Sequence, residues 1–406
     1  MALAELVARG REVAHRAGQY LGIAAGALGW TGDRPLTGPL YAQISISDPC
    51  DHRCVMCEYH PPAEGSAPLE QFGGSRPGVM DVATFERLVD ELDRLGTRQI
   101  DLVGRGEPLL NPRAIEMIAY AKRRGFTVTM ISNGSRLTAE RAQALVRIGL
   151  DRYRLSLDAA LAETYPKIHV SETAASFARV KQQLRQLADA RAQSGTSAPH
   201  VTLSFTVSAL NYRELVEMVD TIASVGADAG HFQHCLPVTP AAEATALSDT
   251  QYAELCSALI PAATARAAAL GVTTNLGGFA ASPPAYRLDR DDTGPGVVPC
   301  YVGSYFTAIL GNGSVMPCCQ TERPIGSVAE RGFTAVWRGE AYAEFRRAAR
   351  KLPASDPALA TCQCDRCYFR PHNLTIHNML HPLSRIRRPE QRLSIGQLVH
   401  MTRQDR

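Results

Sequence analysis

The feature that most constrains the fold is a regular alternation of strand-like and helix-like segments between residues 41 and 234 of the 406-residue chain. Each strand-like segment is a short run rich in apolar residues, and each intervening segment carries apolar residues three or four positions apart. Strands that alternate with helices form parallel sheets joined by right-handed crossovers. The sequence therefore predicts an α/β fold whose strands lie at 41–47, 99–103, 126–131, 152–158, 201–207 and 229–234.

Three cysteines follow the first of these strands, in the stretch Cys50-Asp51-His52-Arg53-Cys54-Val55-Met56-Cys57. Because Asp48-Pro49 ends the strand, the thiols lie on a loop at a strand's C-terminal end, where parallel α/β barrels keep their active sites. Four thiolates usually hold a [4Fe–4S] cluster, so three leave one iron open to another ligand. The alternatives are a chance grouping or a structural zinc site, although such sites usually have four ligands in C-x₂-C pairs.

This C-x₃-C-x₂-C spacing after a strand resembles the radical SAM superfamily. In that family the open iron of the cluster binds S-adenosylmethionine (SAM), which an electron from the cluster cleaves to a 5′-deoxyadenosyl radical. The resemblance implies that Cys50, Cys54 and Cys57 hold the cluster. It also implies a backbone contact between Met56 and adenine, although the family usually has an aromatic residue at that position.

Three later strand ends are similar to cofactor-binding motifs of the same family. Gly104-Arg105-Gly106-Glu107-Pro108 resembles its GGEP motif with an arginine in place of one glycine, which makes Glu107 the candidate for the methionine ammonium. Ser132-Asn133-Gly134 and Ser156-Leu157-Asp158 resemble its T-N-G and S-L-D elements. Each triplet also occurs in ordinary loops, so the evidence for the resemblance is the order of the motifs along the chain. The resemblance implies a partial (β/α)6 TIM-like barrel whose cofactor-binding residues are Met56, Gly104, Gly106, Glu107, Pro108, Ser132, Asn133, Ser156 and Asp158.

A second group of cysteines lies between residues 300 and 367. The turn signal Gly311-Asn312-Gly313 predicts a hairpin that brings Cys300 and Cys318 together, and one helix is expected to return the chain to Cys362-Gln363-Cys364-Asp365-Arg366-Cys367. This region resembles the auxiliary-cluster region of SPASM and Twitch radical SAM enzymes, in its shorter, single-cluster form. The resemblance implies a small C-terminal α+β domain with a [4Fe–4S] cluster on Cys300, Cys318, Cys364 and Cys367. Cys319 and Cys362 are possible substitutes, and a zinc site is the alternative.

The expected organisation is an N-terminal helical extension (1–38), the barrel (39–275), a linker or active-site loop (276–299), the auxiliary domain (300–375) and a basic tail (376–406). At the end of the sixth strand, Cys235 is a candidate hydrogen-atom donor, although a buried core cysteine is the more common case. The polar candidates for substrate contact are His231, His234, Arg105 and Tyr301.

Composition excludes some classes of protein. A net charge of +3 argues against a broad basic surface for nucleic acid. Eleven cysteines without a signal peptide indicate a reducing cytoplasm with thiols that bind metal. The apolar run 20–30 is too short to span a bilayer, so it is expected to pack on the domain, or else to lie on a membrane surface.

The expected activity is the abstraction of a hydrogen atom from a small-molecule substrate. The substrate is expected to be oxidised, with the auxiliary cluster as electron acceptor, as in Twitch dehydrogenases of aminocyclitol and aminoglycoside pathways. The expected partners are this substrate and an electron donor such as flavodoxin or ferredoxin. The alternatives are redox-neutral epimerisation with Cys235 as donor, and modification of a ribosomally made peptide. The segment before the first strand is too short for the leader-binding domain common in peptide-modifying relatives. A zinc-binding protein without enzymatic activity is the alternative from another class.

Overall fold

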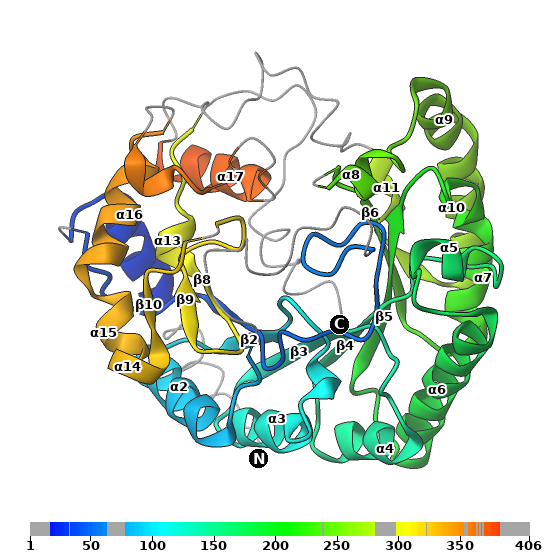
Figure 1. The fold of residues 1–406 in the computed structure, drawn as a ribbon, viewed down its shortest axis with the longest axis horizontal. Coiled ribbons are helices and arrows are strands. Elements are labelled where there is room, and N and C mark those ends of the chain that lie inside the picture. The colour runs from blue at the N-terminus through cyan, green and yellow to red at the C-terminus, as the bar shows by residue number, and fades with distance from the viewer. Residues whose placement is uncertain are drawn as a thin grey trace.

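The computed structural model describes residues 17–31, 33–62, 78–237, 239–280, 298–321, 323–352, 356–362, 364, 367 and 369–381. One ten-stranded sheet runs through this part of the chain, in the order β10-β9-β8-β1-β2-β3-β4-β5-β6-β7. The sheet curves into an open arc with helices along its outer side, which confirms the predicted partial barrel (Figure 1). Its strands are β1 (Tyr41–Ile44), β2 (Gln99–Leu102), β3 (Thr127–Ser132), β4 (Arg152–Ser156), β5 (His200–Val207), β6 (Ala229–His234), β7 (Thr273–Thr274), β8 (Phe306–Ile309), β9 (Ser314–Met316) and β10 (Gly326–Ser327).

Some of the helices that cover the outer side of the barrel begin at a residue whose side chain caps them. Asp81 accepts a hydrogen bond from the backbone of Thr84 (2.8 Å), and Thr138 accepts one from the backbone of Arg141 at the start of a later helix. The covering helices are α2 (Val82–Arg94), α3 (Ala114–Arg123), α4 (Ala139–Arg147), α6 (Ala174–Gln193), α7 (Leu215–Ser224) and α10 (Ile260–Leu270).

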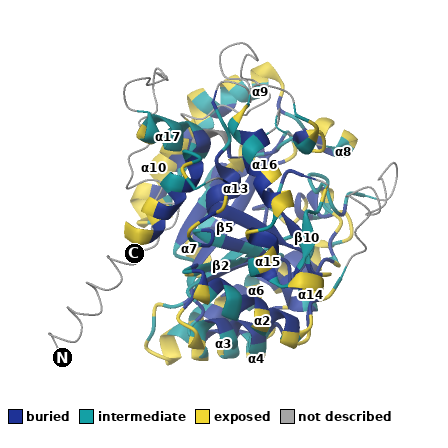
Figure 2. Cartoon of the chain, turned by 90° about the vertical axis from the view of Figure 1, so that its left-hand side faces the viewer, coloured by how far each residue is buried: buried dark blue, intermediate teal, exposed yellow. Residues whose placement is uncertain are grey.

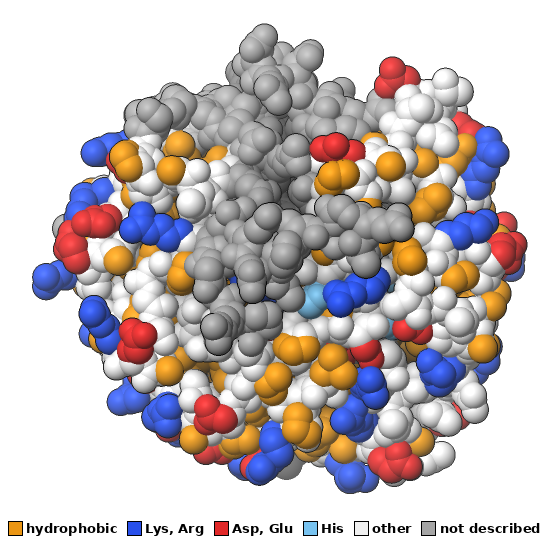
Figure 3. Space-filling view, viewed as in Figure 1, with side chains coloured by type: hydrophobic (Ala, Val, Ile, Leu, Met, Phe, Trp, Pro, Cys, Tyr) orange, Lys and Arg blue, Asp and Glu red, His pale blue; other side chains and the backbone are white. Residues whose placement is uncertain are grey.

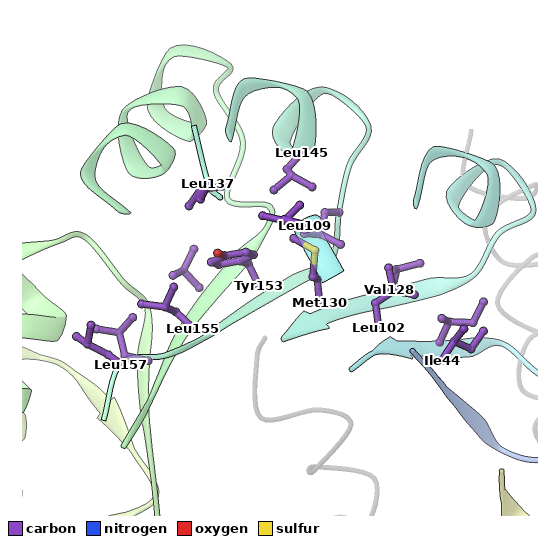
Figure 4. Close-up of a cluster of buried hydrophobic side chains, with 14 of the residues drawn as sticks. Ile44, Leu102, Leu109, Val128, Met130, Leu137, Leu145, Tyr153, Leu155 and Leu157 are labelled. Carbon is purple, nitrogen blue, oxygen red and sulfur yellow. The ribbon is translucent and has the colours of Figure 1, made fainter. Parts of the chain in front are cut away.

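The core lies between the strands and these helices. Alternate strand residues, among them Leu102, Met130 and Leu155, point toward the helices and are completely buried (Figure 4). Figure 2 shows the same layering, with buried residues on the strands and exposed ones on the outer helix faces. Because side chains alternate between the two faces of a strand, the remaining positions face the inside of the arc.

The predicted C-terminal hairpin is confirmed, because β8 and β9 pair antiparallel. The sequence did not indicate that β8 also pairs parallel to β1, so that the hairpin extends the barrel sheet. The single helix predicted after it is wrong: beyond the short α14 (Val328–Arg331), the helical pattern is divided between α15 (Phe333–Trp337) and α16 (Glu340–Arg350). They are separated because Gly339 takes an extended backbone at the start of α16.

The N-terminal segment packs on this C-terminal region. Residues 17–27 are helical, and Ile23 and Ala27 lie in one apolar cluster with Val302 and Phe345. One helical stretch, Asp249–Leu270, is long and apolar enough by composition to cross a membrane. In the structure it packs against α7 as the outer helix that follows β6.

Candidate cofactor and cluster sites

The cysteine loop after β1 is fixed to a distant segment by its backbone. Val55 N donates to the carbonyl of Ile168 (2.9 Å), and Val170 N donates to the carbonyl of Arg53 (2.7 Å). The loop runs inside the arc of strands, drawn in blue in Figure 1. Three thiols are therefore presented together on the inner side of the barrel, at the C-terminal end of β1.

The three thiols of this loop are half-buried and lie near one another. Burial raises the pKa of Cys50 to about 12 and, most strongly, that of Cys54, and charge on neighbouring thiols raises both further. A bound cation would offset this repulsion, so the donor set fits a metal cluster. Among the described residues the three sulfur atoms do not all lie within 4.8 Å of one another. Tetrahedral zinc would need sulfur atoms about 3.8 Å apart at its usual bond length.

Two histidines that the sequence did not single out lie beside Cys54. Its Sγ is 3.1 Å from Nδ1 of His169, and these atoms and a ring nitrogen of His52 lie within 4.8 Å of one another. His169 Nε2 contacts the carbonyl of Leu157 at 3.0 Å, which fixes the ring. His52 is 1% exposed, and its Nε2 is 3.4 Å from Glu172 without hydrogen-bond geometry.

The motifs at the ends of β1, β2 and β3 form one hydrogen-bond network. Glu107 accepts bonds from Leu109 N (2.9 Å), Ser132 Oγ (2.9 Å) and Asn133 N (2.7 Å). The Asn133 amide donates to Asp51 (3.0 Å) and lies 3.7 Å from the Sγ of Cys50. Two segments predicted to bind the cofactor are thus held rigidly against the cysteine loop.

Asp51 is the residue of this network that the sequence did not single out. Besides Asn133, its carboxylate accepts hydrogen bonds from Ser135 Oγ (2.8 Å) and Arg136 Nε (2.9 Å). These bonds hold the pKa of Asp51 below its usual value, although burial opposes them. The sequence carried one signal that could have identified Asp51, namely a charged residue between the first two cysteines of the triad.

The glycines of the Gly104-Arg105-Gly106 segment allow close approach to the end of β1. A Cβ on Gly104 would lie 2.3 Å from the Cβ of Ser45, and one on Gly106 would lie 2.2 Å from the carbonyl oxygen of Pro49. Arg105, which replaces a glycine of the motif, is 7% exposed, and its guanidinium lies 5.5 Å from the ring centroid of Tyr59. The departure is thus accommodated by a cation–π contact.

Asp158 is placed differently from the other cofactor candidates. It is 4% exposed with a positive φ of 55°, and its carboxylate accepts a hydrogen bond from Thr206 N (2.7 Å). This bond joins the end of β4 to β5.

The remaining cofactor candidates lie at separate places in the barrel. Ser156 ends β4 on the inner face, Met56 packs partly buried on the core, and Pro108 begins a short 3-10 helix. Cofactor contact by these residues stays a prediction.

The buried carboxyl of Glu107 leads to a pH prediction. Burial raises its pKa to about 7, whereas an unfolded glutamate titrates near about 4.3. The folded apoprotein binds this proton more tightly, so the stabilisation is complete below about pH 4 and is lost as the pH rises through about 7. Over that range we expect its free energy of unfolding to fall by about 4 kcal/mol relative to Glu107→Gln. Urea denaturation checks this, with exposed Glu217→Gln as control; parallel curves for wild type and Glu107→Gln would contradict it.

The C-terminal cysteines line a common cavity. Its thiols come from the four predicted ligands, Cys300, Cys318, Cys364 and Cys367, and from Cys362; Cys319 is not in its lining. The backbone of α16 fixes this site, because Cys300 N donates to the carbonyl of Ala349 (2.9 Å). A hydrogen bond from Cys364 lowers the pKa of Cys362 to about 7. The cavity thus gathers enough sulfur donors for a closed cluster.

Of the other candidates, Cys235 is 3% exposed, and its Sγ lies 3.9 Å from Thr245 Oγ1. His234 stacks on Phe279, and the Tyr301 hydroxyl lies 2.9 Å from Nδ1 of His377. None of these side chains joins the hydrogen-bond network around the cysteine loop among the contacts of the described residues.

Two family models match the chain. The model described as the radical SAM superfamily matches residues 44–222, and the SPASM model, described as an iron–sulfur cluster-binding domain, matches residues 300–368. The chain therefore carries a radical SAM domain followed by a SPASM domain. A radical SAM enzyme with a SPASM region uses a [4Fe–4S] cluster, SAM and auxiliary iron–sulfur clusters. The thiols of the cysteine loop after β1 and those of the C-terminal cavity both fit that chemistry.

Curated radical SAM relatives cover different shares of the chain. An AdoMet-dependent heme synthase of Nitratidesulfovibrio vulgaris is 24% identical over 82% of this chain and 88% of its own length. A PqqA peptide cyclase of Streptomyces rochei is 26% identical over 75% of this chain and 77% of its own length. The chain spans about half the length (52%) of a tungsten-containing aldehyde ferredoxin oxidoreductase cofactor-modifying protein of Pyrococcus furiosus, at 27% identity over 49% of this chain.

Solved radical SAM structures share the fold. Streptococcus suis SuiB bound to S-adenosylmethionine has a TM-score of 0.60 at 14% identity and covers 84% of this chain and 76% of its own. The structure of anSMEcpe with bound AdoMet has a TM-score of 0.54 at 14% identity and covers 85% of this chain and 93% of its own. At this identity the likeness establishes the architecture of barrel and C-terminal region alone.

Proposed function

We propose that this enzyme cleaves SAM reductively, removes a hydrogen atom from a small-molecule substrate and releases that substrate oxidised. In this proposal Cys50, Cys54 and Cys57 hold the SAM-binding cluster. The auxiliary cluster is held by Cys300, Cys318, Cys364 and Cys367, with Cys362 as the substitute that the cavity favours over Cys319. When bound, the first cluster and SAM supply the hydrogen-abstracting group, and the auxiliary cluster supplies an electron acceptor.

The chain's own residues position these groups and limit side reactions. Glu107, with its carboxylate at the end of β2, orients Asn133 toward Cys50 and Asp51, and it is our candidate partner for the SAM ammonium. Asp51 keeps the cysteine loop in register with the end of β3 through Ser135 and Arg136. A fixed first site is what hydrogen abstraction needs, because misplaced reacting atoms lower rates steeply.

The observation that carries the oxidative proposal is the position of Tyr41 on β1. Burial raises its pKa well above the usual value, and charge on Asp101, Cys319 and Cys318, in that order, raises it further. Tyr41 alternates with the buried Ala42 and Ile44, which places it on the inner side of β1, and it packs against the apolar cluster that contains Cys318. A substrate inside the arc would thus be close to the auxiliary site, as electron transfer between them requires.

Peptide modification is the second candidate, supported by the PqqA peptide cyclase relative. Epimerisation with Cys235 as donor has less support, because that thiol is 3% exposed. For the proposed oxidation we expect a small electron donor such as flavodoxin or ferredoxin and a cytoplasmic setting. Acidic and basic side chains are interspersed on the face of Figure 3, without a single broad basic patch, and nucleic acid is not among the proposed partners.

Iron content tests the two-site assignment. After anaerobic reconstitution we expect about eight irons per chain in wild type and about four in both the Cys50/Cys54/Cys57→Ala and the Cys300/Cys318→Ala variants. The first variant should form no 5′-deoxyadenosine with dithionite, whereas the second should still form it. Cys256→Ala is the matched control and should behave as wild type. Four irons in wild type, all lost in the first variant, would remove the electron-acceptor proposal, and colourless zinc protein would remove the enzymatic one.

A further inference from the structure

The third cysteine of the loop after β1 receives a hydrogen bond from the backbone three residues further on. His60 N donates to the Sγ of Cys57 at 3.1 Å. Hydrogen bonds to the ligating sulfur atoms are among the factors that set the reduction potential of an iron–sulfur cluster. The groups that hold the His60 backbone in place therefore bear on the cluster that Cys57 is proposed to bind.

The side chain of His60 is buried, and both of its ring nitrogens have partners. The residue is 4% exposed; Nε2 lies 2.9 Å from the carbonyl oxygen of Asp48, and Nδ1 lies 3.1 Å from Nη1 of Arg53. A carbonyl can only accept and a guanidinium can only donate, so Nε2 carries the proton and Nδ1 presents its lone pair. The neutral ring is thus held in one orientation by two hydrogen bonds.

Asp48, the acceptor for this ring, is fixed just after the end of β1. It is 1% exposed, and its carboxylate accepts hydrogen bonds from Ser45 Oγ (2.7 Å), Gly78 N (2.9 Å) and Gly311 N (3.0 Å). Gly311 lies in the turn between β8 and β9. The carbonyl that holds His60 is therefore anchored both to the first strand and to the C-terminal hairpin.

Arg53, the donor to this ring, is fixed through its own backbone. Its N donates to Ser171 Oγ (2.9 Å), and its carbonyl accepts from Val170 N (2.7 Å). The exposed guanidinium therefore starts from a backbone that is held on both sides. Two fixed partners restrict the His60 side chain, and through it the backbone N–H that meets Cys57.

The contacts of the other two thiols in this loop are of different kinds. The amide of Asn133 reaches the Sγ of Cys50 only at 3.7 Å. The neighbour of Cys54 is His169 Nδ1, and because Nε2 of that ring faces a backbone carbonyl, a neutral imidazole presents a lone pair to the sulfur. Among the hydrogen bonds of the described residues, the short N–H donor to this cysteine loop's sulfur atoms is the backbone of His60.

We propose that His60 is a positioning residue that raises the reduction potential of the first cluster by holding its own N–H against the Sγ of Cys57. An added electron makes the cluster and its thiolates more negative, so a donated hydrogen bond stabilises the reduced form more than the oxidised form. The bond therefore favours transfer of one electron from the external donor to the cluster. This inference rests on the proposed function, because it assumes that Cys57 is a ligand of the first cluster.

Anaerobic redox titration of the reconstituted holoenzyme, followed by electron paramagnetic resonance, tests this proposal. The signal that changes when SAM is added identifies the first cluster. His60→Gln offers an amide donor at the reach of Nε2, whereas the amide of His60→Asn, one methylene shorter, does not reach the Asp48 carbonyl. We expect His60→Gln to titrate as wild type does. His60→Asn should show about a tenfold lower ratio of reduced to oxidised cluster at a given potential, a shift of about 59 mV for one electron.

The two amide variants are each other's control. Equal potentials in wild type and both variants would overturn the proposal, and so would an equal lowering in both, because the bond to Asp48 would then not be what matters. If His60→Asn holds no iron at the first site, Arg53→Lys decides, since it keeps the charge but loses the planar donor to Nδ1. A ratio about threefold lower would support the proposal, and a wild-type titration would overturn it. Iron content and 5′-deoxyadenosine formation in wild type report on the proposed function independently.

Discussion

Replacing Gly106 by alanine is expected to remove iron from the first cluster site and to abolish SAM cleavage. A Cβ at this position would lie 2.2 Å from the carbonyl oxygen of Pro49 and 2.3 Å from that of Asp48. Both are backbone atoms at the start of the cysteine loop, and Glu107 N donates to the same Pro49 oxygen at 3.0 Å. The clash therefore cannot be relieved by a side-chain rotation, and the loop must move away from β2.

The displacement would separate the cysteine loop from the Glu107 and Asn133 network. Overpacking of this kind costs about 3 kcal/mol in the free energy of unfolding. We expect a lower melting temperature in the apoprotein, about four irons instead of about eight after reconstitution, and no 5′-deoxyadenosine above background. Gly277→Ala is the matched control, because a Cβ there meets no atom within 4 Å. Full iron content in Gly106→Ala would show that the close approach of Gly106 to Pro49 does not position the loop.

Much of the barrel follows from local sequence signals. The period of the apolar residues was enough to place the six strands from β1 to β6. The union of the β8–β9 hairpin with β1 was not predictable, because sheet pairing between residues 41–44 and 306–309 leaves no local pattern. The division between α15 and α16 was missed because their apolar spacing continues across Gly339.

The candidate site was partly predictable for a similar reason. Motifs at strand ends point to Cys50, Glu107 and Asn133, because parallel strands bring their C-terminal ends to one edge. His169 was not identified, because its contact with Cys54 spans 115 residues and no motif surrounds it.

The second large effect is expected at Arg346, a buried cation in α16. Its side chain is 3% exposed and lies between two aromatic rings, 4.4 Å from the centroid of Trp337 and 4.3 Å from that of Tyr342. Its guanidinium donates to the carbonyls of Gly303 (2.8 Å), Trp337 (3.0 Å) and Asp33 (3.3 Å). The one side chain therefore joins the N-terminal segment, α13 (Val302–Tyr305) and the break between α15 and α16.

Arg346→Ala would leave three buried carbonyls without this donor and remove both cation–π contacts. We expect the free energy of unfolding to fall by about 4 kcal/mol, measured by urea denaturation. Arg347→Ala, one residue along, removes a 40%-exposed arginine paired with Asp33 and Glu340, and should cost about 0.5 kcal/mol. Equal effects in the two variants would contradict the assignment.

Arg346→Ala should also lower iron binding at the C-terminal thiols without lowering it at the cysteine loop after β1. The carbonyl of Ala349, three residues beyond Arg346 in α16, accepts the hydrogen bond of Cys300 N (2.9 Å). If Arg346 fixes this helix, its loss should lower iron at the C-terminal thiols under conditions where the protein is still folded. We expect about four irons per chain and retained 5′-deoxyadenosine formation, because the cysteine loop after β1 makes no contact with this arginine among the described hydrogen bonds. Proportional loss of both clusters would instead mean that the barrel and the C-terminal region unfold as one unit, as their shared sheet allows.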